Sequence, residues 1–201
     1  MALELYFIYD SHCPWSYAAT PLLNAVAQAR SDINIHTLHA CHFDGDFSID
    51  NDTINQVKAL SNVEFSNNYM EQCDKKFNAT LVANVMSWVE QKAQGKSLTL
   101  LNAIQKAIFV EGKALQNVEE LSEIIEAYKL SPPGKCLKTD AMAKEAEFAL
   151  GDIDEIQQII GTQAIPALLL AVDDELVLLN HNLYIGAPEK IVEAIALELG
   201  E

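Results

Sequence analysis

The sequence predicts an α/β fold in which a large all-helical insertion separates the second strand from a C-terminal β-hairpin. Residues 3–38 show a strand, helix and strand pattern, and such a unit normally pairs its strands in parallel through a right-handed crossover. Residues 51–149 carry helical periodicity without strand patterns, and residues 167–179 have the pattern of a β-hairpin. We therefore assign residues 1–50 and 150–201 to a sheet-containing domain, with the insertion between the second strand and the hairpin.

The first third of the chain contains the strand, helix and strand unit. Apolar and aromatic residues fill positions 3–9 and end at Asp10-Ser11, which predicts a buried strand and a turn. A helix is expected to begin at Pro14. Proline has no backbone N–H, and in the first helical turn this group would have no partner within the helix. Ser31-Asp32 should end this helix, and residues 33–38 alternate as a second strand.

Amphipathic patterns dominate the rest of the chain. Apolar residues recur three and four positions apart along residues 98–109 and 118–128, as in helices with one buried face. The C-terminal part should contain, in order, a helical run at 153–160, a proline-preceded hairpin with strands at 167–172 and 175–179 around an acidic turn at Asp173-Asp174, and a closing helix at 188–199.

Composition limits the possible partners. Half of the 201 residues are hydrophobic, which allows a substantial core. The 13 Lys and Arg residues against 29 Asp and Glu residues give a formal charge of −16. Because nucleic acids and anionic lipids attract positive charge, we expect neither of them as a partner.

A cytoplasmic location is expected from the termini, the apolar runs and the cysteines. Residues 1–10 lack the basic leader and cleavage site of a secretory signal, and the apolar run at 164–172 is far shorter than the ~20 residues of a membrane helix. The four cysteines stand far apart without a CxxC pair, and a reducing cytosol would keep most of them as thiols. They are Cys13, Cys41, Cys73 and Cys136.

Cys13 is the strongest candidate for chemistry. It stands where the first strand gives way to a helix, and unpaired N–H groups and the positive end of the helix dipole favour a thiolate there. We therefore predict that Cys13 is the most reactive of the four thiols, with a pKa below the ordinary ~8.5.

Three segments carry a family resemblance. Residues 10–17, with the motif Cys13-Pro14-Trp15-Ser16, and residues 161–167, with Ile165-Pro166, resemble the DsbA-like thioredoxin-fold family. Residues 107–121 resemble the insertion of its cytoplasmic branch, near 2-hydroxychromene-2-carboxylate isomerases and kappa-class glutathione transferases. The resemblance implies a thioredoxin fold with a large all-helical insertion. It also implies a cis Ile165-Pro166 bond against Cys13, where the Ile165 backbone pairs with an extended substrate or with glutathione.

The chain departs from this family at three positions. Dithiol members have cysteine where this chain has Ser16, and a hydroxyl cannot resolve a mixed disulfide, so only a single-cysteine (monothiol) route is possible through this motif. The isomerases and transferases often have serine where this chain has Cys13. Relatives often place a histidine where this chain has Ser87-Trp88, so no accessory role is transferred there.

The predicted catalytic residues are Cys13 and Ser16. Ser16 either donates a hydrogen bond to the Cys13 thiolate or caps the helix. His12 either stabilises the thiolate when protonated or is an exposed turn histidine. The predicted substrate-binding residues, among which Trp15 is expected to be exposed, are His12, Pro14, Trp15, Ile165 and Pro166.

Other constellations fit metal or nucleotide sites poorly. His39, Cys41 and His42 include zinc-type ligands, but His42 should point to the opposite strand face and no second ligand pair follows. Residues 44–55 lack the glycine and bidentate acid of a calcium loop, and residues 90–97 lack the first glycine of a phosphate loop. We expect no metal and no tightly bound cofactor.

Three functions remain open. The first is a thiol–disulfide oxidoreductase that forms a mixed disulfide with glutathione as co-substrate. The second is a glutathione-dependent isomerase or transferase of a small electrophile, and the third is a non-catalytic module that holds a peptide at Ile165-Pro166. A homodimer is one option for the oligomeric state. Cys41, Cys73 or Cys136 could resolve a mixed disulfide only if the fold brings it close to Cys13.

Overall fold

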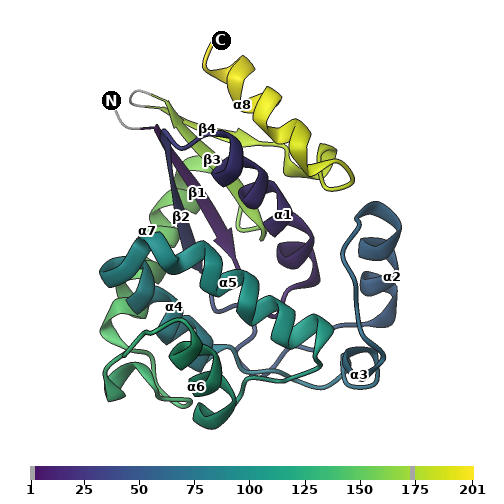
Figure 1. Cartoon of the computed structure of the whole chain (residues 1–201), viewed down its shortest axis with the longest axis vertical. Helices are drawn as coiled ribbons and strands as arrows, with labels where there is room; N and C mark the ends of the chain where they lie inside the picture. The colour runs from purple at the N-terminus through teal and green to yellow at the C-terminus, as the bar shows by residue number, and fades with distance from the viewer. Residues whose placement is uncertain (1–2, 173–174) are drawn as a thin grey trace.

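A four-stranded sheet forms the centre of the computed structural model, which describes residues 3–172 and 175–201 (Figure 1). The strand order is β2-β1-β3-β4. β1 and β2 pair in parallel, whereas β3 is antiparallel to both β1 and β4. The strands are β1 (Leu3–Tyr9), β2 (Ile33–His39), β3 (Ala167–Val172) and β4 (Glu175–Leu179).

Both faces of the central strand β1 are covered, which explains its continuous apolar sequence. Leu5, Phe7 and Tyr9 face one hydrophobic cluster, and Ile8 faces another, as the two-residue period of a strand requires. Helices α1 (Pro14–Ala29) and α8 (Ile191–Glu198) pack on the first face, and helix α7 (Lys144–Ile160) packs on the second. The sheet therefore lies between two helical layers (Figure 1).

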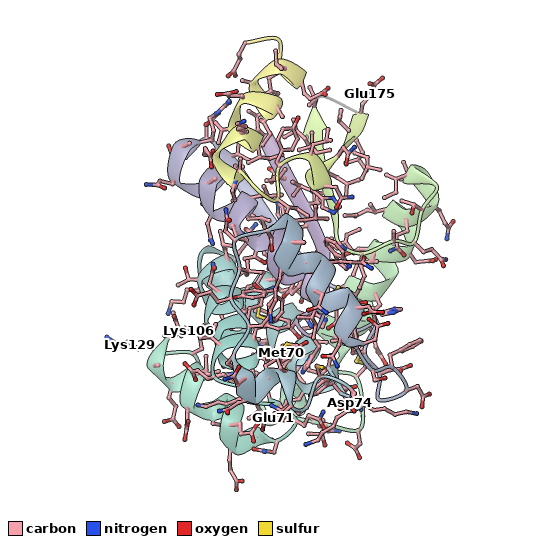
Figure 2. All side chains as sticks on the ribbon, turned by 90° about the vertical axis from the view of Figure 1, so that its right-hand side faces the viewer. Met70, Glu71, Asp74, Lys106, Lys129 and Glu175 are labelled. Atoms are coloured by element: carbon pink, nitrogen blue, oxygen red, sulfur yellow. The ribbon has the colours of Figure 1, made fainter. Side chains whose placement is uncertain are left out.

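The helical insertion continues from β2 and surrounds one end of the sheet (Figure 1). Figure 2 looks onto α2, with Met70 beside it, and the Lys58 Nζ lies 3.6 Å from the Met70 sulfur. Its helices are α2 (Asn51–Leu60), α3 (Asn67–Met70), α4 (Thr80–Ala93), α5 (Ser97–Gln105) and α6 (Val118–Ala127), with a π-helical turn at Lys106–Val110 and short 3-10 turns at Gln94–Lys96 and Gly134–Cys136.

The predicted fold class is confirmed, including the parallel first unit and the C-terminal hairpin. The hairpin turn at Asp173-Asp174 lies outside the described residues. The helical run predicted at 153–160 is the second half of α7, so the proposed boundary at 149–150 falls inside a helix. The closing helix begins as a 3-10 turn at Pro188–Lys190. None of the described helices is long and apolar enough to cross a membrane.

Candidate active site

The β1–α1 turn places Cys13 at the N-terminus of α1. The Cys13 N–H donates to the Asp10 carbonyl at 3.1 Å, and the Cys13 carbonyl accepts from the Tyr17 N–H at 3.0 Å. Cys13 is the N-cap residue, and Pro14 takes the first helical position. The sequence prediction of this helix start is confirmed, and the sulfur lies at the positive end of the helix.

The Asp10 side chain joins this turn to the loop after β2. Its carboxylate is fully buried and accepts from the His12 N–H at 2.8 Å and from the Phe43 N–H at 3.1 Å. A buried carboxylate that accepts two backbone N–H groups fixes both segments, because losing either bond would leave a polar group unsatisfied. Asp10 thus holds the chain on both sides of the Cys13 turn.

Ser16 lies directly beneath the turn rather than on the surface. Its hydroxyl oxygen accepts from the Asp10 N–H at 3.3 Å, and the side chain is fully buried. The hydroxyl and the backbone N–H of Ser16 both act on the Cys13 sulfur as donors and lower the pKa of its thiol, although Cys13 closes no capping bond. Of the two roles considered for Ser16, this arrangement favours hydrogen bonding to Cys13.

The predicted lowering of the Cys13 pKa is wrong for this structure. Cys13 is 7% exposed, and burial raises the pKa of its thiol because a thiolate loses solvation there. The nearby Asp10 charge acts in the same direction, and the donors from Ser16 and Trp15 do not compensate. Burial also raises the pKa of Cys73, Cys136 and Cys41, the last to about 12.

His12 is buried, and its surroundings favour the neutral form of the ring. It is 1% exposed, and its Nε2 lies 3.0 Å from the Ala114 carbonyl, which requires a proton on Nε2. Burial lowers the pKa of His12, so the neutral ring is favoured and both predicted roles are corrected. His12 instead ties the Cys13 turn to the insertion.

The role of His39 was missed in the sequence. Its Nδ1 accepts from the Cys41 N–H at 3.0 Å, and its Nε2 lies 2.9 Å from the Ser11 hydroxyl. Burial lowers the pKa of His39 to about 4, so the ring is neutral. Both nitrogens are engaged, and no metal-ligand cluster occurs in the described parts of the chain. In the sequence, the only sign of this role is a histidine at the end of a buried strand. That sign does not identify the groups to which the histidine bonds.

Three neighbouring cavities share Ile165 as a lining residue, and Cys13 lines one of them. Cys13, Pro14 and Trp15 line one of about 270 Å³, and Trp15 and Pro166 line a second of about 390 Å³. A third, of about 260 Å³, continues toward α7, and Ile165 borders all three. We call the three together the Ile165 groove. The Ile165-Pro166 peptide bond is cis, as the family resemblance implies.

Most of the predicted site residues are brought together here. Cys13 and four of the five predicted substrate-binding residues line the groove, whereas His12 does not. Trp15 is half-buried rather than exposed. The other three cysteines are free thiols that do not line the groove. A larger cavity of about 530 Å³, bordered by Ser87, lies over the sheet away from Cys13.

The sheet order, the helical insertion and the Cys13 turn define a DsbA-like thioredoxin fold. The chain superposes on cytosolic disulfide reductase DsbM from Pseudomonas aeruginosa, solved with GSH, with TM-score 0.80 and 18% identity, over 98% of this chain and 100% of that one. A 2-hydroxychromene-2-carboxylate isomerase matches with TM-score 0.59 and 13% identity, over 98% and 95% of the two chains. Oxidoreductase DsbA from Xylella fastidiosa matches with TM-score 0.57 and 12% identity, over 99% and 87%.

These likenesses confirm the fold predicted from the motif segments. No protein-family model matches the chain, and no curated protein matches it significantly. At such low sequence identity the superpositions show a shared fold. The chemistry of the site depends on this chain's own residues.

Proposed function

We propose that this protein is a cytoplasmic thiol–disulfide oxidoreductase that works through Cys13 alone. The observation that carries the proposal is the position of Cys13, at the N-terminus of α1 and in the wall of the Ile165 groove. Ser16 occupies the position of a second cysteine, where it donates to the sulfur but cannot replace it in exchange.

The reaction proceeds by two exchanges that balance in sulfur and charge. The Cys13 thiolate attacks one sulfur of a disulfide, a new S–S bond to Cys13 forms, and the other sulfur leaves as a thiolate that takes up a proton. An external thiolate then attacks the mixed disulfide and releases Cys13. The net result of the two exchanges is one released substrate thiol and a new disulfide between the other half of the substrate and the external thiol. A second molecule of the external thiol would reduce that disulfide in a third exchange.

Glutathione is our proposed external thiol, as a co-substrate that is not bound tightly. The proposal is supported by the structural likeness to DsbM, which was solved with GSH. Because the Cys13 thiol is buried and its pKa is raised, little thiolate is present near neutral pH, so the first exchange should become faster as the pH rises. We expect the mixed disulfide to accumulate, since no neighbouring thiol resolves it.

Mass spectrometry after incubation with oxidised glutathione tests this proposal. We expect one glutathione adduct, located on Cys13, and its removal by added reduced glutathione. Cys13→Ser should abolish the adduct, while the matched variant Cys136→Ser, on a buried thiol in the insertion, should retain it. An adduct on Cys41, Cys73 or Cys136 in the wild type would contradict the assignment of Cys13.

A glutathione-dependent isomerase or transferase is the second candidate. The likeness to a 2-hydroxychromene-2-carboxylate isomerase and the 390 Å³ cavity beside Trp15, which has room for a small electrophile, favour it. In that case Cys13 or Ser16 would polarise the glutathione sulfur without a mixed disulfide. Full activity of Cys13→Ser toward a small electrophile would establish this candidate in place of the redox one.

A non-catalytic peptide-binding module is the third candidate. The raised pKa of the Cys13 thiol favours it, because a binding module needs no reactive thiolate. Tight binding of an extended peptide without any adduct on Cys13 would support this function.

A further inference from the structure

The walls of the Ile165 groove carry negative charge and no positive side chain. Among the described residues, those that line it include the carboxylates Asp50 and Asp154 and no lysine or arginine. Both carboxylates are exposed to solvent at the rim. Two histidines also line the groove. Burial lowers the pKa of His181, so this histidine is neutral near pH 7, and His42, which is exposed, borders two of the three cavities.

Beyond the residues that line the groove, the surface carries charges of both signs. In Figure 2, Glu71 and Asp74 lie in the lower part of the view, and Lys106 and Lys129 lie at its left side. Lys76 pairs with Asp46 at 3.8 Å. The chain as a whole has a formal charge of −16, so the long-range field has the same sign as the groove.

Neither helix N-terminus at the groove is free to hold an anion. Cys13 occupies the N-terminus of α1, and Asp50 caps α2 by accepting from the Thr53 N–H at 2.6 Å. Trp15 lines two of the three cavities, and the face of an indole ring attracts cations. The local groups therefore favour a neutral or cationic occupant over an anionic one.

We infer that the Ile165 groove selects disulfides that are neutral or positively charged around the S–S bond and discriminates against anionic disulfides. This inference rests on the proposed function and names the substrate class of the same site. The first exchange takes the sulfur of a neutral or basic disulfide onto Cys13, and glutathione releases it in the second exchange. The same charges oppose glutathione less, because its net charge is about −1 and that of oxidised glutathione is about −2. Oxidised glutathione, with four carboxylates and two ammonium groups, is a slow substrate for the first exchange.

Three small disulfides test the inference on the full-length protein. They are cystamine, which is cationic, hydroxyethyl disulfide, which is neutral, and oxidised glutathione, which is anionic. The rate of adduct formation on Cys13 is measured at low salt and about pH 8, above the ordinary histidine pKa. Each rate is divided by the rate of a small free thiol with the same disulfide, which removes differences in intrinsic reactivity.

We expect the normalised rates to fall in the order cystamine, hydroxyethyl disulfide, oxidised glutathione, with roughly a tenfold span or more. The span should shrink severalfold at about 0.5 M salt, since salt screens charges at the rim. Equal normalised rates, or a preference for oxidised glutathione, would overturn the inference and leave the proposed function standing. If none of the three forms an adduct on Cys13, both fail.

Variants at the rim provide the second measurement. Asp50→Asn keeps an N-cap acceptor for α2, and Asp154→Asn keeps an oxygen for the Gln158 amide. We expect the double variant to lower the normalised ratio of cystamine to oxidised glutathione by about threefold or more. The double variant Glu193→Gln/Glu198→Gln, which removes two charges from the exposed side of α8, is the matched control and should leave the ratio unchanged. A ratio that the rim double variant does not change would contradict the assignment of selectivity to the rim carboxylates.

Discussion

Opposing local effects act on the Cys13 sulfur. Burial and the Asp10 carboxylate disfavour the thiolate, whereas the Ser16 hydroxyl and N–H favour it. The prediction of a reactive thiolate rested on the position of Cys13 at a helix N-terminus. That position is one of several contributions to the pKa of the thiol. The desolvation of the sulfur, which depends on residues distant in the chain, outweighs it here.

Asp10→Asn should lower the pKa of the Cys13 thiol. The carboxylate raises that pKa, so removing its charge makes the thiolate easier to form. We expect the pH profile of Cys13 alkylation to move to lower pH. Because asparagine has one side-chain carbonyl for the two N–H groups that Asp10 accepts, the free energy of unfolding should drop by about 1–3 kcal/mol.

Asp32→Asn is a suitable comparison for this experiment. Asp32 is an exposed carboxylate that pairs with Arg30 at the surface, so its replacement should leave the alkylation profile of Cys13 unchanged. A profile that stays in place or moves to higher pH in Asp10→Asn would show that Asp10 does not control the thiol.

Ser16→Cys should convert the monothiol route into a dithiol one. The Ser16 side chain already acts on the Cys13 sulfur, so a thiol there should reach it and displace a bound partner. We expect the oxidised variant to contain a Cys13 disulfide and to oxidise a reduced peptide stoichiometrically without glutathione, measured by mass spectrometry. Ser16→Ala removes the same hydroxyl without adding a thiol, and it should lack this activity.

At the scale of elements, the contact between α3 and the end of the π-helical turn depends on Gly112. Its φ is +71°, and a Cβ built there would lie 2.7 Å from the Asn68 Cβ. The Gln72 amide also donates to the Gly112 carbonyl. Gly112 therefore allows α3 to approach the segment that leads to Ala114, the partner of His12.

Gly112→Ala should destabilise the protein by more than ~1 kcal/mol, because both the positive φ and the close Asn68 contact oppose a side chain. Urea unfolding measures this effect. Gly151→Ala, inside α7 with open space around its Cα, should instead stabilise by roughly 0.5–1 kcal/mol. If both variants changed stability equally, the close approach of α3 would not be the cause.

At the scale of the whole molecule, the buried histidines make folding sensitive to acid. The folded-state pKa of His39 is lowered to about 4, whereas an unfolded chain protonates histidine near ~6.5. The unfolded state therefore binds more protons between these values, and stability falls as the pH falls through this window. His12 contributes with the same sign, and His36, whose pKa is raised by Glu90 and Glu4, contributes with the opposite sign.

The His39 contribution should amount to about 2 kcal/mol of unfolding free energy lost between about pH 7 and pH 5. Urea unfolding at both pH values measures the loss. His39→Gln should be less stable at neutral pH, because the buried bonds to Ser11 and Cys41 change, but its stability should depend less on pH by about that amount. An unchanged pH dependence in His39→Gln would show that another group is responsible.

The sequence by itself determined the fold class and the position of Cys13 at the start of α1. Strand patterns have a period of two, helix patterns have a period near 3.6, and proline and cysteine at a strand end mark a helix start, so local residues suffice for these features. The motif segments also carried the resemblance that the superpositions confirm, including the cis bond before Pro166. Helix boundaries were less accurate, as α7 shows: it begins at Lys144, ahead of the run predicted at 153–160, and part of its first half is buried.

Only the tertiary structure decided the electrostatic state of the site. The pKa of Cys13, the neutral state of His12 and the engagement of His39 depend on burial and on partners such as Ala114, which lies 102 positions from His12 in sequence. The negative charge of the Ile165 groove likewise comes from Asp50 and Asp154, which separate segments place in two cavities that share Ile165. Desolvation and Coulomb interactions act through space, so a pattern along the chain does not reveal them until the fold is known.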